Sequence, residues 1–141
     1  MSEESTRPDL VGMHRAMVEA AAGQDIDGAM LFFAPDAVWN TGATHSGGIY
    51  EGAAEIRSFV DDWLDVLDGL EISVLDVSGF GDDVTLIAIE QRIQPPGGTA
   101  LIEESFQVVA KWLNGRVTDA TNYRDIAEAR AAAKQLARER G

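Results

Sequence analysis

The sequence predicts an α+β fold in which a curved antiparallel or mixed β-sheet wraps around helices from the first half of the chain and encloses a pocket. Two observations lead to this prediction. Apolar residues recur at helical spacing as far as Asp68, whereas from Glu71 onward β-branched residues fill runs that turn sequences separate. The last helix before these runs carries so much apolar surface that it must lie on a sheet, and a meander can curl around it.

Two helices are expected first. Pro8–Ala22 places leucine, methionine and alanine at helical spacing, with its proline tolerated near the first turn. Asp25 or Asp27 can then cap a second, short helix. That helix is expected to include Phe33 and to stop at Pro35, because proline removes a backbone donor and clashes with the preceding turn.

A short strand, a loop and a third helix are expected next. Residues 37–40 are β-prone and aromatic, so they predict a strand. The glycine-rich residues 41–52 have too few apolar side chains for anything but a loop or a small hairpin. The third helix is expected over residues 53–68, where apolar residues recur at helical spacing.

Four strands should follow as an antiparallel meander. Glycine, proline and asparagine clusters separate the runs, and Asn114-Gly115 is a strong hairpin signal. The expected strands are residues 71–80, 84–94, 101–113 and 117–124.

The remaining segments complete a single domain over residues 1–141. Asp125 and Glu128 form a capping-box pattern, which predicts a peripheral C-terminal helix over residues 126–141. Its strong apolar positions are Ile126 and Leu136, and its end is expected to fray. Residues 1–7 are polar and acidic and are expected to be a disordered tail.

Composition narrows the classes of function. With 141 residues and 45% hydrophobic content the chain can bury one core, and it has no cysteine for disulfides or thiolate chemistry. A net charge of −13 disfavours nucleic acid and anionic membranes as partners. The start of the sequence lacks the pattern of a signal peptide, so we expect a cytoplasmic protein. Glycine spacing does not fit phosphate binding, so we expect no nucleotide cofactor and no other cofactor.

The order of these elements and four motifs resemble a known superfamily. The motifs are Phe33-Ala-Pro-Asp-Ala-Val-Trp39, the Gly48–Phe59 segment, Asn114-Gly-Arg-Val117 and Tyr123-Arg-Asp-Ile-Ala-Glu-Ala129. In them the chain resembles the nuclear-transport-factor-two-like superfamily, and within it the SnoaL-like polyketide cyclase and ketosteroid-isomerase-like groups. The resemblance implies a conical α+β barrel, also described as a cystatin-like roll, with a deep apolar cavity and a sheet face used for homodimers. It implies no single reaction, because the superfamily mixes enzymes with binding proteins.

Glu90 and Arg92 are the first candidates for catalysis. They alternate on one expected strand, so their side chains share a face and can form a charge pair. If that face lines the pocket, the acid lies beside apolar neighbours, which is the setting general acid–base catalysis uses. The alternative, which the pattern supports equally, is that the face of Ile87 and Ile89 is the buried one.

Three further polar residues are catalytic candidates. The limonene-epoxide-hydrolase-like branch of the superfamily has an Asp-Arg-Asp arrangement. Here Glu90 and Arg92 stand in reversed order, and Asn122 replaces one of the carboxylates. These two departures argue against epoxide hydrolysis, because a neutral amide cannot take up a proton as a carboxylate does. Asn122 can instead donate to a substrate oxygen or serve as an ordinary strand residue. His45 can transfer protons from the loop or lie exposed in it. In ketosteroid-isomerase-like members a carboxylate base lies near the short first strand, and Asp36 is the residue nearest to that position here. Asp36 can also turn the chain after Pro35.

Large aromatic residues predict the walls of the pocket. Core packing explains most of them, and Trp39, Tyr50 and Trp63 are singled out as ligand contacts because they lie near the loop and on the third helix. His14 is expected to pack within the first helix or to offer a donor to the pocket, and no third ligand for a metal accompanies the histidines. The predicted ligand contacts are Trp39, Tyr50, Trp63, Phe59, Phe106 and His14.

Three functions remain in competition. The first is a cofactor-independent isomerase, cyclase or hydrolase-like enzyme that acts by general acid–base catalysis on an apolar carbonyl compound. The second is a protein that only binds a small apolar or aromatic ligand. The third is an interaction domain in which the sheet face that bears Ile87, Ile89, Val109 and Leu113 forms a homodimer and the pocket is vestigial.

Overall fold

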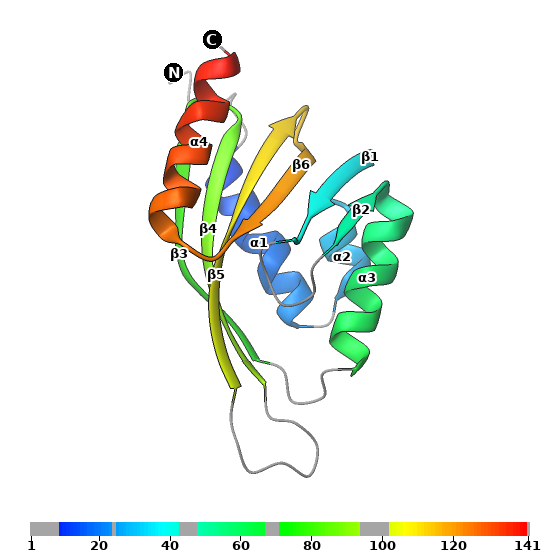
Figure 1. Ribbon diagram of the computed structural model, residues 1–141. Helices are drawn as coiled ribbons and strands as arrows, with labels where there is room; N and C mark the ends of the chain where they lie inside the picture. The colour runs from blue at the N-terminus through cyan, green and yellow to red at the C-terminus, as the bar shows by residue number, and fades with distance from the viewer. Residues whose placement is uncertain (1–8, 24, 43–47, 67–70, 94–101, 141) are drawn as a thin grey trace.

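The computed structural model describes residues 9–23, 25–42, 48–66, 71–93 and 102–140. Helices and strands both occur along the chain, which confirms the predicted α+β class (Figure 1). The elements are α1 (Leu10–Ala22), α2 (Ile26–Met30), β1 (Phe33–Asn40), β2 (Ile49–Glu51), α3 (Ala53–Val66), β3 (Glu71–Phe80), β4 (Val84–Ile93), β5 (Ile102–Leu113), β6 (Arg116–Tyr123) and α4 (Ile126–Arg140). The predicted tail of residues 1–7 lies outside the described residues.

One curved sheet of six strands organises the molecule, in the order β2-β1-β6-β5-β4-β3. The predicted meander is confirmed, because β3, β4, β5 and β6 pair in sequence as antiparallel neighbours. β1 runs parallel to β6, which makes the sheet mixed. In Figure 1, α1, α2 and α3 lie on the inner side of the curved sheet, and α4 lies on its outer side.

Aspartate caps begin the first two helices. Asp9 accepts a hydrogen bond from the backbone N–H of Gly12 at 3.1 Å. Asp25 accepts one from the N–H of Gly28 at 3.0 Å, which confirms it as the cap of α2. Each carboxylate satisfies a donor that has no partner within its own helix, and its negative charge suits the positive end of the helix dipole.

The second helix is shorter than predicted. The expectation that it includes Phe33 and stops at Pro35 is wrong, because both residues belong to β1. The register between β1 and β6 shifts between Phe33 and Val38, so Pro35 lies in an irregular part of the strand. Proline is tolerated there because a bulged stretch does not require its missing N–H for the ladder.

Both faces of the central strands are covered. On the inner face Ile87, Ile89 and Phe106 belong to the main core, which includes residues of α1 and α3. On the outer face Val109 packs against α4 in a second cluster. The prediction of an exposed dimer surface is therefore wrong for Ile87, Ile89 and Val109, and of that set Leu113 alone is exposed.

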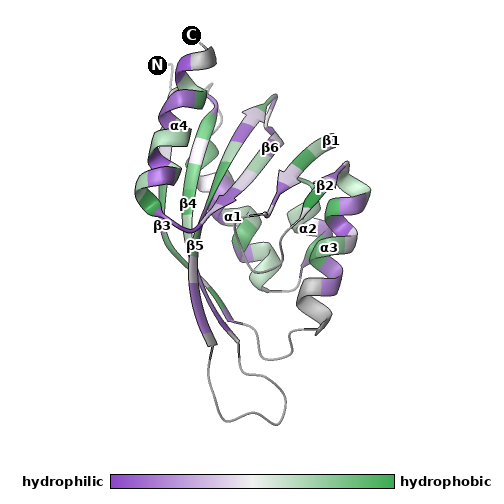
Figure 2. Ribbon diagram, viewed as in Figure 1, coloured by the Kyte–Doolittle hydropathy of each residue, from purple (hydrophilic) through white to green (hydrophobic). Residues whose placement is uncertain are grey.

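Alanine makes the contact between α4 and the sheet. Ala129 and Ala133 are fully buried, and Leu136 and Ala137 pack beside them. Ile126, one of the two strong apolar positions of the predicted helix, is 41% exposed. Small side chains let the helix approach the strands closely, and Figure 2 shows hydrophilic and hydrophobic bands alternating along α4.

Candidate functional site

A small apolar pocket lies between the inner face of the sheet and the helices. Its volume is about 70 Å³. α1 contributes Met17 and Ala21 to the walls, α2 contributes Met30, and the central strands contribute Ile89 and Val108. The pocket is small beside the roughly 300–1,000 Å³ of drug-sized sites, so it suits a ligand of a few non-hydrogen atoms.

His14 is the one ionisable side chain among the described residues that line this pocket. It is fully buried in α1, and its Nδ1 lies 2.7 Å from Oγ1 of Thr85 on β4. Its Nε2 has no hydrogen-bond partner within the described part of the chain. Burial lowers the pKa of His14 from 6.5 to about 3, since a charged imidazole loses its hydration there. At neutral pH the pocket therefore holds a neutral imidazole.

A second buried side chain forms a hydrogen bond with Thr85. Trp112 on β5 donates from Nε1 to Oγ1 of Thr85 at 2.8 Å. The rings of Trp112 and His14 also pack edge to face, with centroids 5.9 Å apart. We call these three side chains the Trp112–Thr85–His14 relay. All three are nearly or fully buried, so their hydrogen bonds are shielded from water.

Aromatic side chains close another wall of the pocket. Trp39 and Phe106, both predicted ligand contacts, line the pocket together with His14. Trp39 packs edge to face on Phe59, and Phe59 stacks on Tyr50 with centroids 4.4 Å apart. Phe59 and Tyr50 therefore support the wall from behind Trp39. Trp63 is part of α3, but its side chain lies outside the described residues, as does all of His45.

Asn122 is buried beside this wall. Its Oδ1 accepts a hydrogen bond from Nε1 of Trp39 at 2.8 Å. Asn122 and the pocket-lining Ala120 alternate on β6 and therefore share a face of the sheet. The geometry shows that Asn122 orients Trp39, which is a packing role that the sequence pattern did not indicate.

Glu90 and Arg92 point away from the pocket. Their neighbours Ile89 and Gln91 face inward, so strand alternation places the pair on the outer face of β4. There the Nε of Arg92 lies 3.5 Å from Glu90 and 3.4 Å from Glu103. The alternative in which this pair faces the pocket is wrong, because the face of Ile87 and Ile89 is the one that lies toward α1, α2 and α3, whereas α4 packs on the opposite face.

A polar cluster that sequence analysis missed lies on the inner face. Nε2 of Gln91 donates to Oε1 of Glu104 at 2.6 Å, and Arg124 lies 3.4 Å from the other carboxylate oxygen. The side chain of Glu104 is only 20% exposed. The alternation of Glu104 with the aromatic Phe106 is the signal that places it inward, whereas its neighbour Glu103 faces outward.

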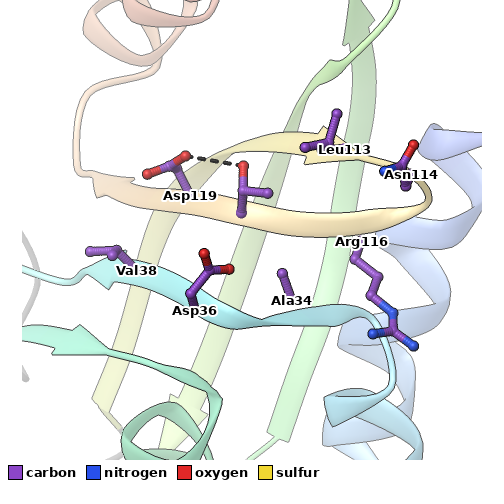
Figure 3. A pocket seen from close by; sticks show the side chains of 8 residues that line it. Ala34, Asp36, Val38, Leu113, Asn114, Arg116 and Asp119 are labelled. Carbon is purple, nitrogen blue, oxygen red and sulfur yellow. Dashed lines mark hydrogen bonds between the residues drawn. The ribbon is translucent and has the colours of Figure 1, made fainter.

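Asp36 lies in a different hollow, an open groove of about 580 Å³ between β1 and β6. Figure 3 shows its carboxylate and that of Asp119 within this groove, where Asp119 accepts a hydrogen bond from the hydroxyl of Thr118 at 3.0 Å. Arg116 extends along the same groove. Asp36 is exposed and lies outside the apolar pocket, so it does not join His14 and Trp39.

Within residues 9–140, apart from the gaps given above, no three histidine, aspartate or glutamate side chains gather closely enough to hold a metal ion. None of the described helices has the length and apolar character that crossing a membrane requires.

Comparisons with known proteins agree with this fold. The model of the SnoaL-like domain family matches residues 14–120. A search among curated proteins finds no match. Among solved structures, a protein of ketosteroid isomerase-like fold from Catenulispora acidiphila, in complex with trimethylamine, has a TM-score of 0.70 at 15% identity, covering 90% of this chain and 93% of its own.

Two other solved structures are similar. An NTF2-like protein from Burkholderia pseudomallei has a TM-score of 0.68 at 21% identity, covering 84% of this chain and 92% of its own. TerC, co-crystallised with polyporic acid, has a TM-score of 0.66 at 20% identity, covering 85% and 93%. At these identities the likeness shows the fold alone.

Proposed function

The chain belongs to the SnoaL-like domain family, and on that premise we propose that its apolar pocket binds a small, neutral, largely apolar molecule. The observation that carries this proposal is a cavity of about 70 Å³ whose walls are apolar except for one buried imidazole. Such a hollow favours apolar ligands, because binding removes their surface from water. Two similar structures contain small organic molecules, trimethylamine and polyporic acid, which supports a ligand of that broad kind.

Filling the pocket should abolish binding. Ala21 lines the pocket from α1, so Ala21→Leu places extra carbon atoms inside it, whereas Ala22→Leu adds them to an exposed neighbour in the same helix. We expect cyclobutanone to shift the amide resonances of α1, β5 and β6 saturably in the wild type. Ala21→Leu should weaken its affinity by about tenfold or more, since a displaced ligand loses its buried contacts.

The control decides how this result is interpreted. Ala22→Leu should bind cyclobutanone as the wild type does, and the amide spectrum of each variant should show a folded protein. Unchanged affinity in Ala21→Leu, or shifts confined to the outer face of the sheet, would show that the pocket is not the binding site.

Glu104 favours a second candidate function, general acid–base catalysis. Its carboxylate lies on the pocket face of the sheet, and Gln91 and Arg124 hold it in place. Glu104 lies two positions from the pocket-lining Phe106 and outside the described pocket wall, so its carboxylate can act on a carbonyl compound that extends past Phe106, by removing a proton from the carbon next to the carbonyl group. Glu103 is the matched control, because it is the adjacent glutamate and faces the opposite side of β5.

This activity can be measured without the natural substrate. We expect the protein to accelerate exchange of the α-protons of cyclobutanone with deuterium oxide, followed by proton NMR. Glu104→Gln should reduce the protein-dependent rate by about 100-fold, and Glu103→Gln should leave it unchanged. If Glu104→Gln keeps the wild-type rate, or the wild type does not exceed buffer, the enzyme hypothesis at Glu104 fails and the binding hypothesis is unaffected.

A further inference from the structure

The Trp112–Thr85–His14 relay determines which nitrogen of His14 carries a proton. An indole N–H can only donate, so Oγ1 of Thr85 acts as the acceptor toward Trp112. Oγ1 also lies 2.7 Å from Nδ1 of His14. Within the described part of the chain, these two side chains are the ones that contact the Thr85 hydroxyl.

The hydroxyl proton of Thr85 therefore has one acceptor available to it. Trp112 cannot accept, so this proton is donated to Nδ1 of His14. In the opposite tautomer Nδ1–H and Trp112 would both donate to Oγ1, and the hydroxyl proton would remain buried without a partner. Because Thr85 is only 1% exposed, water cannot supply that partner. The ring proton of His14 is consequently on Nε2.

The protonated Nε2 is the group left for a ligand. His14 lines the pocket, is fully buried, and has no partner at Nε2 among the described residues. The other polar side-chain atom of the pocket wall, Nε1 of Trp39, already donates to Asn122. The pocket thus offers one hydrogen-bond donor, without a charged group or an open acceptor in the described wall.

We propose that His14 is the specificity-determining residue of the pocket, and that its Nε2–H selects small neutral carbonyl compounds by donating a hydrogen bond to the carbonyl oxygen. This inference rests on the proposed binding function and names its ligand class. A ketone or aldehyde carries a hydrogen-bond acceptor and no donor, which complements a pocket wall that offers one donor and no open acceptor. An alcohol would bring a proton with no acceptor, and a carboxylate would bring a charge that no cation in the described wall neutralises.

The tautomer can be tested without any ligand. In the full-length protein, long-range ¹H–¹⁵N NMR of the imidazole rings should show a proton-bearing Nε2 and a bare Nδ1 for His14. The chain contains two histidines, so His45→Gln leaves a single ring to observe. A proton-bearing Nδ1 in the wild type would overturn the proposal.

A pair of isosteric probes tests the ligand class. Cyclobutanone and methylenecyclobutane have nearly the same shape, but only the ketone accepts a hydrogen bond. We expect the wild type to bind the ketone roughly two- to tenfold more tightly, as one neutral hydrogen bond allows. His14→Phe should remove this preference while the hydrocarbon still binds.

The outcomes separate the two proposals. Equal affinity of the wild type for both probes would overturn the role of His14 and leave the binding function standing. Failure of both probes to bind would overturn the binding function and this inference with it. If His14→Phe does not fold, the ring NMR of the wild type still decides the tautomer.

Discussion

His14→Asn should remove a large part of the acid sensitivity of the fold. Burial lowers the pKa of the native His14 from 6.5 to about 3, so between these values the unfolded chain binds a proton that the native protein does not. Stability is therefore complete above pH 6.5 and falls as the pH is lowered toward 3. Asparagine does not titrate, and its short amide can still reach Thr85.

The size of the effect follows from proton linkage. One extra proton bound by the unfolded state changes the free energy of unfolding by about 1.4 kcal/mol per pH unit. At about pH 5 the wild type should have lost roughly 2 kcal/mol through His14 alone. Urea unfolding of wild type and His14→Asn from about pH 7.5 down to about pH 5 measures this loss, because subtracting the two curves cancels the other titrating groups.

The asparagine variant is expected to be less stable than the wild type at neutral pH, since it leaves part of the ring volume empty. The informative quantity is the difference between the two free energies, which should shrink as the pH falls. If the two curves remain parallel across this range, His14 keeps an ordinary pKa in the folded protein, and the lowering of its pKa by burial is refuted.

Much of the fold could be predicted because local patterns determine it. The switch from helical spacing to β-branched runs separates α3 from β3, and Asn114-Gly115 forms the turn between β5 and β6 with both residues at positive φ. The second helix was predicted too long because helical spacing continues to Phe33, whereas parallel pairing of β1 with β6 decides the actual boundary. That pairing joins segments far apart in the sequence, so no local pattern indicates it.

The site was harder to predict because alternation defines two faces of a strand but not which of them is inward. α4 covers the outer face over Leu86, and that contact depends on Ala129 and Ala133, which carry a weak hydrophobic signal. Both faces of β4 therefore contain apolar residues, so the pattern supported either face equally and did not determine on which one Glu90 lies. Glu104, by contrast, follows from its alternation with Phe106 once the inner face is known.

The relay shows a similar limit of sequence analysis. His14 and Thr85 are 71 positions apart, and Trp112 belongs to yet another strand. His14 was expected to pack within the first helix or to offer a donor to the pocket, and the structure places it fully buried in the pocket wall. The identity of its partner depends on the register between β4 and β5 and on how α1 lies across them.

Thr85→Val should destabilise the protein by about 2–4 kcal/mol, although valine has nearly the shape of threonine. The substitution leaves Nε1 of Trp112 and Nδ1 of His14 buried without their shared partner. Each such group costs about 1–3 kcal/mol, because it has lost water and gained no replacement. Urea unfolding at neutral pH, where His14 is uncharged, measures the loss directly.

Two further variants test whether that loss of stability comes from the hydrogen bonds of Thr85. Thr121→Val makes the same chemical change on β6 at a hydroxyl with no hydrogen-bond partner in the described part of the chain, so it should alter stability by no more than about 0.5 kcal/mol. The double variant Thr85→Val with Trp112→Phe should cost less than the sum of its single changes, because phenylalanine no longer presents a buried donor that needs an acceptor. Strict additivity, or a Thr85→Val loss as small as that of Thr121→Val, would show that the threonine hydroxyl does not connect the two rings.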